Sequence, residues 1–197
     1  MRRLILSLAG LATLSAATPA LAQFSESYKF LEAVRKKEGE KVTQALADPA
    51  QTVINTRDVT SGETALHIVT NRRDLTWMQF LIAKGANVNA RDAKGVTPLV
   101  SAVNANFVEG VELLLSKSAR MDESNNAGET PLITAVHNRN IAVMRLLLKA
   151  GADPDRADNS GRSAKDYARL AGGNLLSEIE TNAKPKGDKA KSYGPKF

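Results

Sequence analysis

The sequence predicts an all-α solenoid, in which short helical units of equal length stack side by side. Three observations predict it. Glycines recur at one constant interval, at Gly62, Gly95, Gly128 and Gly161. The residues after them also repeat, as G-E-T-A-L-H, G-V-T-P-L-V, G-E-T-P-L-I and G-R-S-A-K-D. Apolar residues between these strings lie at helical spacing. Because one unit cannot bury its apolar face alone, three or more must stack into a continuous core.

Each unit is expected to begin with a turn followed by a short helix. The glycine allows a positive φ at the turn. A threonine two residues later can cap the helix with its hydroxyl, and a proline can follow where its missing N–H costs nothing. These positions are Thr64, Thr97 and Thr130 for the caps, and Pro98 and Pro131 for the prolines.

A second, longer helix is expected to complete each unit. In the third unit the first helix is predicted over about 131–138 and the second over about 141–149, where Met144 and Leu147 share one apolar face. Gly85 and Gly151 should end second helices as left-handed caps. Ser118 takes that position in the middle unit and should strain or loosen its turn.

The strings at the ends of the units identify a family. The segments 80–90, 113–123 and 146–156 read F-L-I-A-K-G-A-N-V-N-A, L-L-L-S-K-S-A-R-M-D-E and L-L-L-K-A-G-A-D-P-D-R. With the T-P-L strings, they resemble the ankyrin repeat over roughly residues 28–180. The resemblance implies helix-turn-helix units with β-turn fingers. Three full repeats are expected, at 58–91, 92–124 and 125–157.

The units at both ends are expected to be caps. Residues 23–57 form a degenerate first unit, with one amphipathic helix around Tyr28, Phe30, Leu31 and Val34 and another around Val42, Ala45 and Leu46. The string Val53-Ile54-Asn55 resembles the end of a repeat. Residues 158–182 form the C-terminal cap, with helices predicted over 164–170 and 175–181. There Lys165 replaces the family's leucine, as expected for a terminal unit with one solvent-exposed face.

Residues 1–22 are predicted to be a secretory signal peptide. Arg2 and Arg3 precede an apolar run over 4–17, Pro19 interrupts the helix, and Ala20-Leu21-Ala22 provides small residues for cleavage between Ala22 and Gln23. The alternative is an uncleaved anchor, but the run is short for a membrane span. The leader looks bacterial, so we expect export to the periplasm without a stable membrane anchor.

The net charge of +6 is concentrated at the two ends of the chain. Two arginines lie in the leader, and the segment 184–197 carries five lysines and one aspartate, so residues 23–183 are neutral. A neutral body argues against nucleic-acid binding. Residues 183–197 are expected to be a disordered basic tail, with at most weak, salt-sensitive contact with anionic components of the envelope.

No catalytic or cofactor motif is found. The chain has no cysteine, which excludes disulfides, thiolate metal sites and thiol nucleophiles. Glycine-rich phosphate loops and the G-x-S-x-G nucleophile motif are absent. The acidic loop of Asp153, Asp155 and Asp158 is interpreted as an ordinary repeat loop rather than a cation site. We therefore predict no enzyme activity, no cofactor and no metal.

The two histidines and the single tryptophan have different expected roles. The resemblance implies that His67 bridges neighbouring turns by hydrogen bonds. His137 falls near the end of a first helix and is either a binding residue or merely exposed. Trp77 begins a second helix, which faces the convex side, so packing is expected. No spacing of histidines suits a metal.

The resemblance places binding on the concave surface, formed by the turn tips and the first helices. The candidate residues there are polar and mixed in charge, and only a minority are expected to carry binding energy. They are Thr60, Ser61, Glu63, Asn71, Arg72, Lys94, Val96, Asn104, Asn126, Glu129, His137, Asn138, Asn159 and Arg162.

The sequence therefore predicts a monomeric protein-binding module whose partner is another protein. This inference rests on the family's general use of the fold. Two narrower functions remain open: an immunity or inhibitor protein against a periplasmic toxin or enzyme, and a factor that protects the envelope under stress.

Overall fold

The computed structural model describes residues 19–47 and 53–183, with side chains from residue 26 onwards. These ranges contain ten α-helices and one 3₁₀-helix and no extended strand. The elements are α1 (Pro19–Lys36), α2 (Gly39–Ala45), η1 (Val53–Asn55), α3 (Ala65–Asn71), α4 (Leu75–Ala83), α5 (Pro98–Asn104), α6 (Val108–Ser116), α7 (Pro131–His137), α8 (Ile141–Ala150), α9 (Ala164–Ala171) and α10 (Leu175–Asn182).

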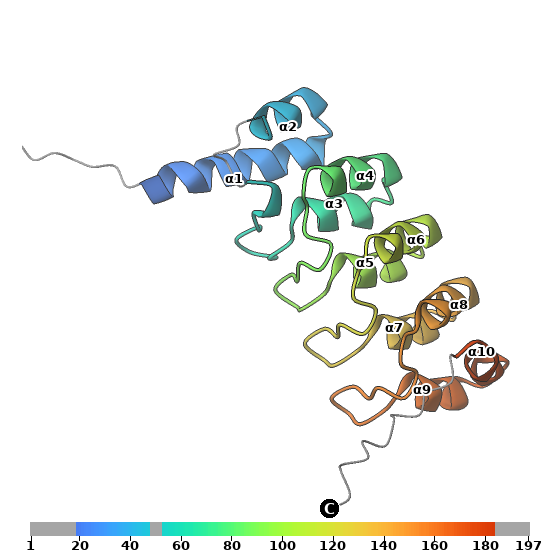
Figure 1. Ribbon diagram of the computed structural model, residues 1–197. Coiled ribbons are helices and arrows are strands. Elements are labelled where there is room, and N and C mark those ends of the chain that lie inside the picture. The colour runs from blue at the N-terminus through green and yellow to red at the C-terminus, as the bar shows by residue number, and fades with distance from the viewer. Residues whose placement is uncertain (1–18, 48–52, 184–197) are drawn as a thin grey trace, which may run out of the picture.

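The helices form two parallel rows (Figure 1). The inner row consists of α3, α5, α7 and α9, and the outer row of α4, α6, α8 and α10, with each helix packed on the next in its row. Helix α1 packs against α3 and extends the inner row. The loops before the inner helices project to one side, and we call them fingers (residues 58–63, 92–96, 125–129 and 158–162). The predicted all-α solenoid is confirmed.

The core consists of layers in which the same positions recur in each repeat. Leu66, Leu99 and Leu132 are fully buried in the inner row. The outer row contributes two series of fully buried residues: Met78, Val111 and Met144, and Leu81, Leu114 and Leu147. In the last unit, Lys165 continues the leucine series. Its side chain is 32% exposed, and Nζ lies 2.8 Å from Asp155 Oδ1. The last unit therefore exposes a face that the other units bury.

Inner helices α5 and α7 begin as expected. Thr97 and Thr130 accept a hydrogen bond from the backbone N–H three residues later, at 3.3 and 3.2 Å. Pro98 and Pro131 occupy the first turn. Ser163 caps α9, and Asp166 bonds back to the Ser163 amide at 3.0 Å. Each bond satisfies an amide that the helix itself leaves without a partner.

The outer helices end where the glycines predict. Gly85 and Gly151 have φ values of +90° and +109°, in the left-handed region. Ser118 adopts the same conformation, with φ +60°. The expectation of strain at this turn agrees with that geometry, because a β-carbon makes the left-handed region unfavourable.

The N-terminal cap packs on the first repeat through α1. Phe30, Leu31 and Val34 are buried, as expected, and Val42 is buried in α2. The expected place of Tyr28 on the apolar face is wrong: its side chain points to solvent and is 65% exposed. With 3.6 residues per turn, the buried residues Phe30, Ala33 and Val34 lie on the side of α1 opposite Tyr28.

Asn55 confirms that the cap ends like a repeat. Its Oδ1 accepts from the Asn87 amide at 2.7 Å. Asn89 accepts from the Arg120 amide at 2.8 Å and Asp122 from the Asp153 amide at 3.0 Å. Asn55, Asn89 and Asp122 thus make the same contact to the following unit.

The described part of helix α1 spans Pro19–Lys36 and so includes the predicted cleavage position between Ala22 and Gln23. Residues 1–18 of the predicted signal peptide and residues 184–197 of the predicted tail lie outside the described residues. In the described ranges, no helix is both long and apolar enough to cross a membrane.

Candidate protein-binding surface

Each finger is shaped by the carboxylate or amide of its first residue. Asp92 Oδ1 accepts from the amides of Lys94 and Val96, both at 2.8 Å. Asn125 and Asp158 hold their fingers in the same way, and Asp58 accepts from the amides two and three residues later. These bonds close a tight turn without help from neighbouring repeats.

Backbone hydrogen bonds link successive fingers. We call the contacts between consecutive units, from the repeat at 58–91 to the C-terminal cap, the first, second and third junctions. An amide of the later finger donates to a carbonyl of the earlier one: Ala93 to Ser61 at 2.9 Å, Asn126 to Lys94 at 2.9 Å and Asn159 to Ala127 at 3.1 Å. A β-carbon on Gly128 would lie 2.6 Å from the Asn159 nitrogen, so only glycine permits this approach.

Asparagine side chains add a second bond at two of these junctions. Asn126 Nδ2 donates to the Ala93 carbonyl at 3.1 Å, and Asn159 Nδ2 donates to the Asn126 carbonyl at 3.0 Å. Ala93 occupies the equivalent position at the first junction and has no side-chain donor. Asn126 and Asn159, both predicted to bind a partner, therefore also tie the fingers together.

Residues at the C-terminal ends of the inner helices form a row of exposed side chains. The row consists of Asn71, Asn104, His137 and Leu170, which occupy equivalent positions in successive units, and all four are exposed. We call these four residues the inner row of side chains, to distinguish them from the inner row of helices. The inner surface consists of this row and the fingers. Leu170 is 71% exposed, which is unusual for a large apolar side chain in this protein.

In the first and third repeats, a glutamate of the finger contacts the side chain at the end of the inner helix. Asn71 Nδ2 donates to Glu63 Oε1 at 2.9 Å, and Ser61 Oγ donates to Glu63 Oε2 at 3.2 Å. In the third repeat, His137 Nδ1 lies 3.6 Å from Glu129 Oε1. Val96 takes the glutamate position in the second repeat, so Asn104 has no such partner there.

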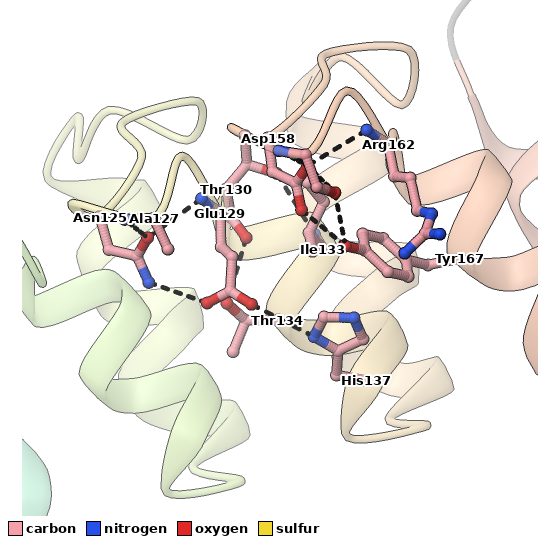
Figure 2. Close-up of polar contacts among 11 residues, drawn as sticks. Asn125, Ala127, Glu129, Thr130, Ile133, Thr134, His137, Asp158, Arg162 and Tyr167 are labelled. Carbon is pink, nitrogen blue, oxygen red and sulfur yellow. Dashed lines mark hydrogen bonds and ion pairs between the residues drawn. The ribbon is translucent and has the colours of Figure 1, made fainter.

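The third repeat and the C-terminal cap share a polar and aromatic cluster (Figure 2). The rings of His137 and Tyr167 meet edge to face, with centroids 4.5 Å apart. The Tyr167 hydroxyl donates to Asp158 Oδ2 at 2.6 Å. This bond and that from the Ser160 hydroxyl lower the pKa of Asp158 well below its usual range. Tyr167 is therefore held in place, with its ring beside an exposed histidine.

Two further candidates tie neighbouring units together through the loop after an inner helix. Arg72 Nη1 donates to the Val34 carbonyl at 2.5 Å, and its guanidinium lies 5.1 Å from the centre of the Trp77 ring. Asn138 Nδ2 donates to the Val103 carbonyl at 3.2 Å. The Trp77 ring also packs edge to face on Phe80, which agrees with the expected packing role.

The structure thus divides the fourteen predicted residues into two groups. In the first group, the side chain bonds to the backbone of a neighbouring unit. This group consists of Arg72, Asn126, Asn138 and Asn159. The others lie on the fingers and the inner helices: Thr60, Ser61, Glu63, Asn71, Lys94, Val96, Asn104, Glu129, His137 and Arg162. Lys94 and Asn104 are both exposed. Ser61, Glu63, Val96 and Glu129 are half-buried, and the prediction of a binding surface stays a prediction.

Tyr167 and Leu170 are not among the residues predicted from the sequence. Leu170 continues the series of Asn71, Asn104 and His137, so extending that series by one unit finds it. Tyr167 continues another series, with Ile68, Ser101 and Thr134. An aromatic residue at a position that is small or aliphatic in the other units is the signal that would have identified it.

His67 has the structural role that was expected. Its Nδ1 accepts from the Thr64 amide at 3.2 Å, which leaves Nε2 to donate to the Val96 carbonyl at 3.0 Å. Burial lowers the pKa of this imidazole. His67 therefore links the first repeat to the second finger in its neutral form.

The predicted binding residues do not coincide with a hollow of the surface or with a group of metal ligands. A shallow hollow of about 440 Å³ lies among the loops after α6 and α8, lined in part by Arg120, Asp122 and Arg156. None of the predicted binding residues lines it. Within residues 19–47 and 53–183, no group of three histidine, aspartate or glutamate side chains could hold a metal ion.

Comparison with known proteins agrees with this architecture. A family model described as ankyrin repeats (3 copies) matches residues 30–125, and one described as ankyrin repeats (many copies) matches residues 117–168. A search of the curated proteins finds no match. Ankyrin repeats generally serve as protein-binding modules, and proteins built from them are typically non-enzymatic scaffolds. The matched residues, the two rows of helices and the linked fingers together show that this chain belongs to the ankyrin-repeat family.

Proposed function

We propose that this protein is exported to the periplasm and binds a partner protein there along its inner surface, without catalysing a reaction. The observation that carries the proposal is the contrast between two kinds of side chain on that surface. Some bond to neighbouring units, whereas Lys94 and Asn104 are exposed and form no side-chain hydrogen bond or ion pair with the other described residues, and Leu170 is exposed and apolar. Such side chains are free to meet a partner.

The C-terminal end of the surface is the proposed centre of binding. The rings of Tyr167 and His137 meet edge to face there, and Leu170 exposes apolar area one turn beyond Tyr167. Binding energy tends to concentrate in a few residues, with tyrosine enriched among them. A side chain held in place before binding loses less conformational entropy when a partner arrives. Tyr167 meets this condition because Asp158 fixes its hydroxyl.

Export is supported by the leader rather than by the fold. Two arginines, an apolar run and the small residues of Ala20-Leu21-Ala22 make up the secretory pattern. The absence of cysteine from the whole sequence suits an oxidising compartment. Fusion of residues 1–30 to a reporter that is active only after export would test this part. An inactive reporter would overturn it.

Binding can be tested by affinity capture from an envelope extract, with the purified protein as bait. The test variant is His137→Ala with Leu170→Ser, which removes an exposed ring and an exposed apolar chain from the inner surface. The matched control is Gln79→Ala with Glu112→Ala, two exposed positions on outer helices α4 and α6.

The proposal predicts that the wild type and the control capture the same protein, whereas the test variant loses it. All three must show equal helix content by circular dichroism. Capture that survives in the test variant and disappears in the control would contradict the proposed surface.

A further inference from the structure

The last unit changes the pair of residues that connects a finger to the end of its inner helix. In the first and third repeats the finger contributes a glutamate. It contacts the polar side chain eight residues later, at 2.9 Å in the case of Asn71 and 3.6 Å in the case of His137. The equivalent residues of the last unit are Arg162 and Leu170, and both are exposed. Because leucine has no acceptor for a guanidinium, this pair cannot form the contact that the other two units have.

The guanidinium of Arg162 forms no hydrogen bond or ion pair with the other described residues, although its backbone amide donates to Asp158 Oδ1 at 3.1 Å. Both oxygens of Asp158 already have partners. Oδ1 accepts from the Ser160 hydroxyl at 2.7 Å, and Oδ2 accepts from the Tyr167 hydroxyl at 2.6 Å. In Figure 2 the Arg162 side chain extends away from the Asp158 carboxylate, toward the side on which the Tyr167 ring lies. Its donors are therefore available to a ligand.

The other carboxylates at this end of the inner surface have partners on both oxygens as well. Glu129 contacts Asn125 at 2.9 Å in addition to the histidine, and Asp166 bonds to the start of α9 and to an arginine one turn later. Arg139 is exposed, and its guanidinium donates to the Ala171 carbonyl at 2.6 Å rather than to a carboxylate of the described residues. The surface here thus presents hydrogen-bond donors and apolar area, so a ligand must supply the acceptors.

We propose that the partner is recognised through an acidic side chain that binds Arg162 and a neighbouring apolar side chain that packs on Leu170. This inference rests on the proposed function and names the chemistry of the partner. A guanidinium matches a carboxylate through two parallel hydrogen bonds. Burial of a leucine favours an apolar group beside that carboxylate. Nucleic acid and phosphate-bearing lipid fit less well, because residues 23–183 carry no net charge. The ligand is therefore an acidic and apolar segment of a protein.

Selection from a library of random peptides displayed on phage, with the purified protein as bait, tests this chemistry. The wild type should enrich peptides in which aspartate or glutamate stands next to a large apolar residue. For a synthetic peptide of the enriched sequence, Arg162→Glu should weaken binding about tenfold or more, because it places two carboxylates together. Arg162→Gln keeps donors without the charge and should bind with intermediate affinity. Lys149→Glu, the same charge reversal at an exposed position of α8, is the matched control and should bind like the wild type.

Two results would overturn the proposal. One is a selection in which the wild type enriches no acidic peptides. The other is an acidic peptide that Arg162→Glu binds as tightly as the wild type does. Capture from the envelope extract separates this inference from the proposed function. A protein that is lost with His137→Ala and Leu170→Ser but retained by Arg162→Glu would show that the inner surface binds a partner of another chemistry. The proposed function would then stand and the acidic partner would be wrong.

Discussion

The first junction of the array and the last two are built on the same backbone but are tied differently. At the second and third junctions, Asn126 and Asn159 add side-chain bonds between the fingers. At the first junction Ala93 adds none, and the buried His67 provides the link instead. The N-terminal cap joins the first repeat through arginines: Arg35 lies 2.7 Å from Asp58, and Arg72 bonds to the Val34 carbonyl.

The difference shows that the period of the repeats determines where a bond between units can form, whereas the side chain determines whether it does. Repeat arrays are stabilised by the sum of the units and of the contacts between neighbours. Each junction can therefore be weakened or strengthened separately, and the comparison between junctions can be measured.

The largest effect is expected from closing the space between fingers. In Gly128→Ala, the new β-carbon would lie 2.5 Å from Asn159 Oδ1, and the alanine would also have to adopt a φ of +82°. Gly85→Ala is the matched control, because φ there is +90° and nothing lies within 4 Å of the added carbon. We expect a loss of about 3 kcal/mol for the first and about 1 kcal/mol for the second. Equal losses in urea unfolding would show that the fingers do not constrain the glycine.

A smaller effect is expected from the asparagine bonds. Asn159→Ala should lower the free energy of unfolding by about 1 kcal/mol, because it removes a hydrogen bond to a backbone carbonyl. Ala93→Asn should raise it by a similar or smaller amount, since it supplies the first junction with the bond that the others have. Urea unfolding of both variants measures the effects. If Ala93→Asn destabilised the protein, the junctions would not be equivalent.

The first junction should also be the one that responds to mild acid. Burial lowers the pKa of His67, so the unfolded chain takes up the proton before the folded protein does. Stability should therefore decrease as the pH falls below about 6.5. In His67→Gln this decrease between pH 7 and 5 should be smaller, and His137→Gln should keep it. Urea unfolding at several pH values is the measurement, and an unchanged decrease in His67→Gln would count against this role.

The smallest effect is expected at the turn after α6. Ser118→Gly should stabilise the protein by about 0.5 kcal/mol, because glycine adopts the φ of +60° without strain but gains more entropy in the unfolded chain. Thermal unfolding can detect the gain. A lower melting temperature would mean that the serine side chain contributes more than its conformation costs.

Much of the fold could be predicted because the period is visible within a single chain. Thr97 and Thr130 mark helix starts and Gly85 and Gly151 mark helix ends, since capping depends only on local backbone geometry. The buried series of Leu66, Leu99 and Leu132 could be found in the same way. The prediction for Tyr28 was wrong because it followed the residue's apolar character, whereas the helical period sets Tyr28 opposite the buried Phe30, Ala33 and Val34.

The candidate site was harder to predict from residues alone. Asn126 and Asn138 look like ordinary surface residues, but their amides bond to carbonyls of the preceding unit, those of Ala93 and Val103. Those partners are backbone atoms, which leave no mark in the sequence. The edge-to-face contact of Tyr167 with His137 joins two units and likewise becomes visible only when the units are placed side by side.

The most direct test of the binding surface is site-specific photo-crosslinking in cells. A photoreactive residue is placed on the inner row of side chains, at Asn71, Asn104 or Leu170. The control positions are exposed residues of the outer helices, Gln79, Glu112 and Arg145. We expect one adduct of constant mass from the inner positions, strongest at Leu170, and none from the outer ones. An adduct from the outer positions alone would contradict binding along the inner surface.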